Sequence, residues 1–223
     1  MYRKGISIII LSFLLLLTSC FEIVEEVSFN EDGSGHVTLT LNLSRSKTKL
    51  NSIQLLDSIN DYKVPTEAEI KHHFTEVTNT IKKTKGISNV TNSLNFEEYI
   101  YTISCDFTSV EVLNMVISNF SSKNEAEKIK EYKHFGFNKD QHTFTRNYHY
   151  DLAKEFNKTK MADRKIFENA TVTTIYRFTD PIIASKNTTA KISKNKKAIF
   201  LKINAQDIIT NKNSIKNQIQ LQD

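Results

Sequence analysis

The sequence predicts an α+β fold in which a mainly antiparallel sheet, formed by hairpins, packs against about three helices. Hydrophobic residues alternate with polar ones in several short segments, which is the period of strands. In other segments they recur every three or four residues, which is the period of helices. The 223 residues are 39% hydrophobic with 5 Gly and 2 Pro, so they can bury a core without a linker-rich break. We therefore expect one domain over residues 20–223, after a signal peptide at residues 1–19.

A targeting signal occupies the first twenty residues. Residues 1–4 are cationic, and residues 6–17 form an apolar run that is shorter than the about 20 residues a membrane span needs. The Leu-Thr-Ser-Cys sequence at residues 17–20 resembles the lipobox of bacterial lipoproteins, which implies cleavage before Cys20 and a diacylglyceryl group on its thiol. Two or three acyl chains attach a protein stably to a membrane, at about 0.8 kcal/mol per buried methylene. An ordinary secretory signal followed by a chance Cys is the alternative.

The residue after Cys20 and the net charge bear on location and partners. Phe21 stands where an Asp would favour the inner membrane by the enterobacterial sorting rule. We therefore expect a periplasm-facing protein on the outer membrane, with surface display as the alternative. The net charge is +5, and removing Arg3 and Lys4 leaves 28 basic against 25 acidic residues. That weak excess lacks the dense basic stripe that nucleic-acid binding needs, so no nucleic-acid partner is expected.

The mature chain begins with a predicted hairpin. Two runs of alternating apolar residues, 21–29 and 37–43, flank residues 30–35, whose Asp-Gly supplies the turn geometry. A calcium loop is the other interpretation of these Asp and Asn residues. We favour a tight turn because the spacing and terminal Glu of an EF-hand are absent.

The middle of the chain predicts three helices and two strands. Apolar spacing predicts a first helix over residues 46–61, which Val64-Pro65 ends. A capping box, Thr66 to Glu69, opens a second helix that stops at Gly86. Strands follow at 87–96 and 99–107, and the four residues 108–111 form a second capping box, which opens a third helix.

The last third of the chain predicts mainly strands. The polar residues 121–131 indicate a solvated helix or loop, and residues 132–137 and 142–150 indicate a hairpin. Residues 152–168 have some helical character around Phe156 and Phe167. Strand patterns occur at 172–178, 197–203 and 215–221.

These features together resemble a known group of proteins. The lipobox, the Asp-Gly-Ser-Gly turn at residues 32–35, the helical middle, and the Tyr-Arg-Phe-Thr-Asp-Pro-Ile sequence at 176–182 with Ser-Lys-Asn at 185–187 are similar to uncharacterised lipoproteins of Bacteroidetes. They are more distantly similar to LppM-type envelope lipoproteins. The resemblance implies a membrane-anchored α+β domain, and it carries over no catalytic residue.

The sequence contains no motif typical of a catalytic site or a metal site. Phosphate loops, nucleophile elbows, zinc helices and Cys-x-x-Cys motifs are absent from the sequence. His72 and His73 are neighbours on one helix, where Glu69–His73 and His72–Glu76 ion pairs account for them better than zinc. In the hairpin, a four-residue loop would place Phe137 opposite His142 and His134 opposite Thr145. His149 then lies beyond the paired strands and the three rings do not converge, so we expect no metal, cofactor or catalytic residue.

The two cysteines are predicted to have different roles. Cys20 and Cys105 are the two Cys of the chain, so lipidation of the first excludes an internal disulfide. Cys105 shares one face of its strand with Tyr99, Tyr101 and Phe107, which predicts a buried structural thiol.

We expect a noncatalytic binding or assembly role in the envelope, with an envelope protein or lipid as the partner. The alternatives are a carrier of lipid or another hydrophobic ligand, and a hydrolase with an unrecognised site.

Overall fold

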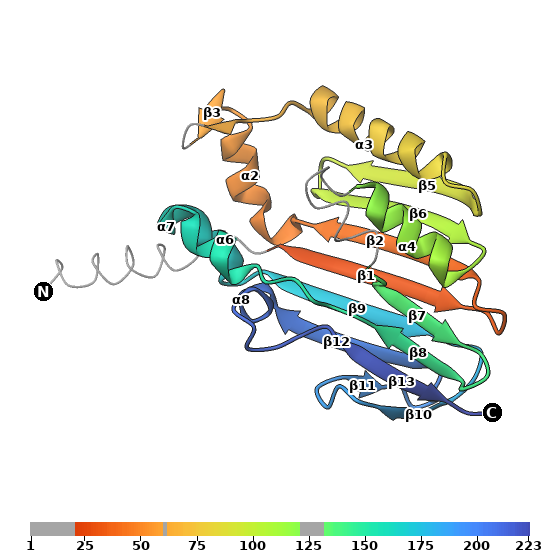
Figure 1. Ribbon diagram of the computed structural model, residues 1–223. Coiled ribbons are helices and arrows are strands. Elements are labelled where there is room, and N and C mark those ends of the chain that lie inside the picture. Colours follow the sequence, from red (N-terminus) through yellow and green to blue (C-terminus); the bar gives the residue numbers. More distant parts are fainter. Residues whose placement is uncertain (1–20, 60–61, 121–131) are drawn as a thin grey trace, which may run out of the picture.

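The computed structural model describes residues 21–59, 62–120 and 132–223, and it has the predicted α+β architecture. Seven strands form a main sheet in the order β11-β12-β9-β1-β2-β6-β5 (Figure 1). Its neighbours are antiparallel except for the parallel pair β1 and β9. The strands are β1 Glu22–Phe29, β2 Gly35–Asn42, β5 Ile87–Asn95, β6 Ile100–Phe107, β9 Thr171–Arg177, β11 Lys191–Ile192 and β12 Ala198–Asn204.

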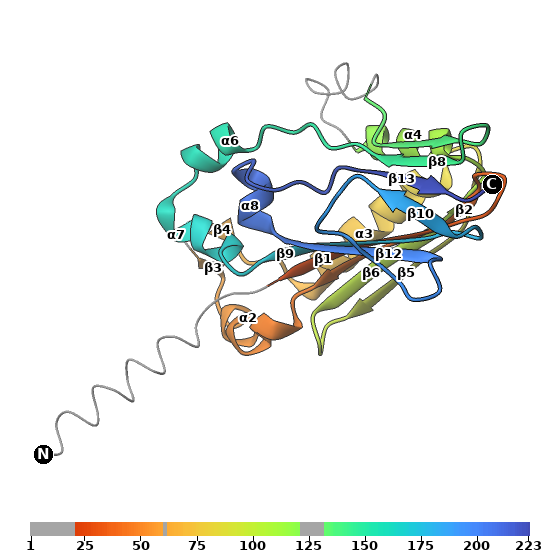
Figure 2. The same cartoon turned by 90° about the horizontal axis from the view of Figure 1, so that it is seen from below.

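A second antiparallel sheet lies over one face of the main sheet, in the order β10-β13-β8-β7 (Figure 2). Its strands are β7 Phe135–Asn138, β8 Thr143–Arg146, β10 Ile182–Ser185 and β13 Asn217–Leu221. Two long helices, α3 Glu67–Lys82 and α4 Val110–Asn119, cover the rest of that face. Shorter elements complete the chain: η2 Ser44–Ser46, α2 Lys47–Ile53, the β3–β4 pair Ser58–Ile59 and Tyr62–Lys63, α6 Ala153–Lys158, α7 Met161–Arg164, η3 Lys165–Phe167 and α8 Ala205–Ile209.

Strand alternation separates the two faces of the main sheet. In β1, Val27 and Phe29 are 1% and 4% exposed, whereas Ser28 between them is exposed. The inner face packs on the second sheet around Phe29, whose ring lies 4.7 Å from that of Phe144 and 5.4 Å from that of Phe178. The opposite face is polar, with ion pairs such as Glu26–Arg177 across neighbouring strands. The hydrophobic core therefore lies between the two sheets and beneath the helices.

The first hairpin is confirmed, and its turn has the geometry expected of Asp-Gly. The Oδ1 atom of Asp32 accepts hydrogen bonds from the backbone N–H and the hydroxyl of Ser34. Gly33 has φ +80°, a conformation that glycine adopts without steric cost. Strands β1 and β2 then pair along eight residues each. The tight-turn interpretation of residues 30–35 is therefore correct.

The prediction of a helix over residues 46–61 is wrong beyond Ile53. Helix α2 ends there, and the chain continues into the short β3–β4 pair, closed by a hydrogen bond from the N–H of Val64 to the carbonyl of Asp57. Polar residues that favour turns, Ser52 and Asp57 among them, weaken the helix, and none of the residues of α2 is buried. Packing therefore does not compensate for weak helix propensity in this segment.

Two further predictions are wrong by one or two residues. Helix α4 is capped by Ser109, whose side chain accepts from the N–H of Val112, because the N–H of Thr108 is bonded to the carbonyl of Gly86. In the β7–β8 hairpin, Phe137 pairs with Phe144 and not with His142. The loop is four residues long as predicted, but it spans residues 139–142, so His142 belongs to the turn.

The second helix and the strands that follow it agree with the sequence prediction, as do β9, β12 and β13, whereas β10, β11 and α8 were not predicted. Helix α3 opens with the predicted capping box of Thr66 and Glu69, and Gly86 follows its end with φ +91°. The helical character predicted for residues 152–168 corresponds to α6, α7 and η3. The predicted segments 121–131 and 1–20 lie outside the described residues. Within the described ranges, none of the helices combines the length and the hydropathy that a transmembrane helix needs.

Candidate functional site

An apolar cavity of about 360 Å³ lies between the main sheet and the two long helices. The sheet supplies its floor from the inner faces of β2 and β6, and α3 and α4 supply its walls. A volume of this size is at the lower end of the range for small-molecule sites. The lining residues are Glu25, Val37, Leu39, Val77, Ile81, Ile103, Ser104, Cys105, Leu113, Val116, Ile117, Phe120 and Phe135.

The cavity exists because the helices contact different strands. Helix α3 packs on β5, while α4 packs on β7 and β6. Figure 1 shows α3 at the β5 edge of the sheet and α4 nearer the middle, in front of β6 and β2. Leu39 of β2 and Phe120 at the end of α4 line the cavity and are 45% and 47% exposed, so the cavity opens to solvent beside them.

A buried ion pair stands at one side of this cavity. The carboxylate of Glu25 on β1 accepts two hydrogen bonds from Arg146 on β8, from Nε at 3.0 Å and Nη2 at 2.9 Å. It also accepts a hydrogen bond of 2.6 Å from the hydroxyl of Tyr176 on β9. The side chains of Glu25 and Arg146 are 16% and 8% exposed. The group therefore joins the main sheet to the second sheet, and Glu25 is the charged residue of the cavity lining.

Burial and charge set the protonation states of Arg146 and Tyr176. Burial alone would lower the pKa of Arg146, but the charge of Glu25 and the hydroxyl of Tyr176 outweigh it and raise that pKa. Burial and the Glu25 carboxylate both raise the pKa of Tyr176 well above its ordinary value. The guanidinium also lies 4.5 Å from the centre of the Phe135 ring. Arg146 consequently stays charged, and Tyr176 stays a hydrogen-bond donor to Glu25.

His134 is next to Arg146, whose Nη1 lies 3.5 Å from the carbonyl oxygen of His134, and it is 3% exposed. Its Nε2 atom is 3.1 Å from the hydroxyl of Tyr150, and its ring meets that of Tyr132 edge to face at 4.9 Å. Burial, and then the charge of Arg146, lower the pKa of His134 to about 4. The imidazole is therefore neutral at physiological pH.

The other histidines lie elsewhere. His149 is near Tyr132, with ring centroids 6.4 Å apart, whereas His142 lies at the turn of the hairpin, 3.7 Å from a carboxylate oxygen of Asp223. On α3, His72 and His73 both face Glu76, at 3.5 and 3.4 Å. The predicted Glu69–His73 pair is replaced by contacts of Glu69 with Lys63 and with the start of its own helix. Across the described ranges, no three His, Cys, Asp or Glu side chains are grouped to hold a metal ion.

Cys105 lies on the floor of the cavity and is 3% exposed, which confirms the predicted buried thiol. Burial, followed by the neighbouring Asp106, raises the pKa of Cys105 to about 11. The thiolate is the reactive form of cysteine, so this thiol is inert at neutral pH. The predicted lipidation site, Cys20, lies outside the described residues.

Sequence analysis did not identify Glu25, Arg146 and Tyr176. One signal was available, because Glu25 occupies an inward position in the alternating run Ile23, Glu25, Val27. A charged residue at a core position needs a partner. The partners come from strands more than 100 residues away, and sequence spacing does not reveal such contacts.

Comparisons with known proteins find a likeness of structure but none of sequence. No family model matches the sequence, and no curated protein is similar to it. Among solved structures, the chain is similar to the folded domain of LppM from Mycobacterium tuberculosis, determined by NMR, with a TM-score of 0.41 and 9% sequence identity. The alignment covers 91% of this chain and 91% of that one.

Proposed function

We propose that this protein is a noncatalytic lipoprotein of the bacterial envelope that holds a ligand with one apolar chain in the cavity beneath α3 and α4. It is attached to the membrane through lipid on Cys20, on the outer membrane and facing the periplasm. The observation that carries the proposal is the apolar cavity, which opens to solvent beside Leu39 and Phe120.

The lining favours an alkyl chain over a polar ligand. Eleven of its thirteen residues have hydrophobic side chains or, in Cys105, a buried thiol. Each methylene moved from water into such a site contributes about 0.8 kcal/mol before the costs of association. A chain of about ten carbons therefore has about 8 kcal/mol of gross driving force at that rate.

The charged residue of the lining gives the ligand a preferred head group. Glu25 already accepts three hydrogen bonds, and a carboxylate has about four acceptor positions. A hydroxyl or ammonium group can donate to the remaining position, whereas a carboxylate head group would meet a like charge. We therefore favour a single-chain amphipath with a hydrogen-bond-donating head over a fatty acid.

The protonation states around the cavity support a noncatalytic role. Cys105 keeps its proton at neutral pH, and the hydroxyl of Tyr176 also keeps its proton and donates a hydrogen bond to Glu25. Glu25 is bonded to Arg146 through both oxygens and is thereby held in one orientation. These groups are arranged for stability and recognition, and none of the three is free to act as a nucleophile or a mobile base.

Native mass spectrometry of the full chain, extracted gently from its own membrane, tests the proposal. Wild type should retain one single-chain amphipath, and its fragmentation identifies the head group. Ile103→Phe, which fills the cavity, should lose this ligand. Thr102→Phe, the adjacent position on the opposite face of β6, should keep it. Thermal unfolding of both variants controls for folding.

The alternatives give different results in the same experiment. A wild-type protein without ligand but with a co-purified envelope protein would contradict the carrier role and favour assembly. A bound fatty acid would contradict the head-group preference alone. Turnover of an envelope ester, peptide or glycan that one point substitution abolishes would refute the noncatalytic role.

A further inference from the structure

We propose that one end of the molecule lies against the membrane surface, with apolar side chains of the α2–β4 and α6–η3 segments among the lipid head groups. Figures 1 and 2 show these two segments at the same end of the main sheet, although about 100 residues separate them in sequence. The partner is a lipid bilayer, and this end of the molecule is the face that contacts it. The inference rests on the proposed function in one respect, the attachment of the chain to the membrane through Cys20.

The first observation is an accumulation of exposed apolar side chains at this end. Leu55 is 87% exposed, Met161 is 76%, Tyr62 is 62% and Leu56 is 49%. Single exposed apolar residues are ordinary on protein surfaces. Here the three most exposed large apolar residues of the described chain come from two separate segments at one end, next to a predicted lipid attachment.

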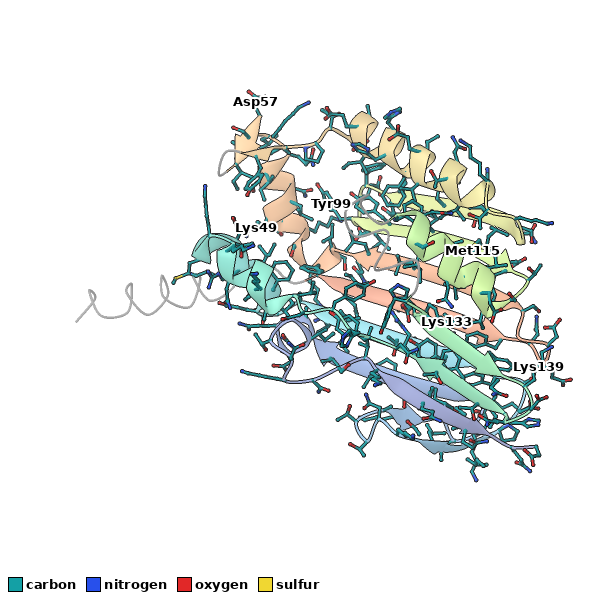
Figure 3. The ribbon with its side chains drawn as sticks, in the orientation of Figure 1. Lys49, Asp57, Tyr99, Met115, Lys133 and Lys139 are labelled. Carbon is teal, nitrogen blue, oxygen red and sulfur yellow. The ribbon has the colours of Figure 1, made fainter. Side chains whose placement is uncertain are left out.

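The second observation is charge. Residues 44–63 and 151–168 contain nine Lys and Arg against six Asp and Glu, so they supply three of the five net positive charges of the chain. Figure 3 shows Lys49 on α2 at this end, with Asp57 above it and Lys139 at the far end of the molecule. Lysine near exposed apolar residues suits a surface of anionic head groups with acyl chains beneath.

The third observation is the path of the chain. The carbonyl of Phe21 accepts a hydrogen bond from the N–H of Thr171, and its ring packs edge to face on Phe167 at 5.8 Å. Phe21 is thus fixed on the α6–η3 segment at the entry to β1. Consecutive Cα atoms are about 3.8 Å apart, so a lipid on Cys20 would lie one residue from this surface. An anchor so close to the fold leaves little room for the opposite end to face the bilayer.

Single tryptophan reporters test the orientation, because the chain has no Trp. We would introduce Leu55→Trp and Met161→Trp, with Ile183→Trp as the matched control. Ile183 on β10 is also an exposed aliphatic residue, at 59%, but lies away from the proposed surface. The full chain, processed in a bacterial host, is reconstituted into phosphatidylcholine and phosphatidylglycerol vesicles that carry bromine near the top of the acyl chains.

The fluorescence of the tryptophans at positions 55 and 161 should shift to the blue and be quenched by the bromine. The fluorescence of the tryptophan at position 183 should keep the wavelength of a residue in water and should not be quenched. Lys49→Glu combined with Lys165→Glu should reduce quenching in vesicles with phosphatidylglycerol and leave it unchanged in phosphatidylcholine alone. Protein that floats with vesicles but shows equal, weak quenching at all three positions would refute this inference alone. Protein that fails to float would refute the anchor and the inference together. A blue shift without bromine quenching would mean that protein and not lipid shields the reporters, and it would also overturn the proposal.

Discussion

Removal of either partner of the buried ion pair between β1 and β8 should destabilise the fold far more than removal of both. Glu25→Leu leaves the guanidinium of Arg146, in a residue only 7% exposed, with two backbone carbonyls in place of a counter-ion. Arg146→Met leaves the carboxylate of Glu25 with the hydroxyl of Tyr176. In each case a charge remains in a largely buried site without its counter-ion.

The expected magnitude follows from burial. Breaking a buried pair typically costs about 3–5 kcal/mol, whereas replacing both partners by hydrophobic residues is often near neutral. For a chain of this size each kcal/mol lowers Tm by about 2–4 °C. The single variants should therefore melt about 6–20 °C below wild type, and Glu25→Leu/Arg146→Met should recover most of that loss.

Thermal unfolding followed by circular dichroism measures these differences, and a double-mutant cycle gives the coupling. The matched control is Glu26→Leu with Arg177→Met, a pair at 2.8 Å on the opposite face of the sheet, with side chains 35% and 48% exposed. Exposed pairs contribute about 0–1 kcal/mol. If the Glu25 and Arg146 single variants melt no lower than those of the control pair, the ion pair does not join the two sheets as argued.

Three other predictions concern single residues. Gly86→Ala should lower the free energy of unfolding, measured by urea titration, by more than about 1 kcal/mol, because φ is +91° and a Cβ would lie 2.6 Å from the hydroxyl of Thr108. Gly136→Ala is the control, because a Cβ there would make an ordinary contact at 3.7 Å, and it should be nearly neutral in the same titration. The pKa of His134 falls from 6.5 to about 4 on folding, so its contribution to the free energy of unfolding is fully present above pH 6.5 and is lost as the pH falls toward 4. Tm should therefore decline less with falling pH in His134→Gln than in the wild type. Equal slopes of Tm against pH would contradict this. Cys105, with its pKa raised to about 11, should react with a thiol reagent at pH 8 only after unfolding, and labelling of the native protein would disprove its burial.

Local sequence patterns predict the fold where the interactions are local. The capping box of Thr66 and Glu69, the turn at Asp32 and the alternation of β6 all depend on residues within a few positions of one another. The pairing of β1 with β9 and the second sheet depend on contacts between distant segments, and the sequence contains no register signal for them.

The cavity was not predictable for the same reason. The sequence predicts helices α3 and α4 and the apolar face of β6, but not that the helices pack on different strands and leave a cavity between them above β2 and β6. Leu39 illustrates this, because its position in the alternation predicts burial while it is 45% exposed. Only the spatial arrangement separates an apolar core from an apolar cavity.

The central position of β1 has a mechanical consequence. This strand follows the proposed anchor directly and is bonded to β2 along one edge and to β9 along the other, over eight and seven residue pairs. A pull on the tether along the strand would load both ladders in shear, so that many hydrogen bonds resist together and none is peeled off singly. One of the two ladders is contributed by residues about 150 positions later in the chain. The protein therefore resists such a force fully only after the last third of the polypeptide has folded. Before that stage β1 is held by its pairing with β2 alone.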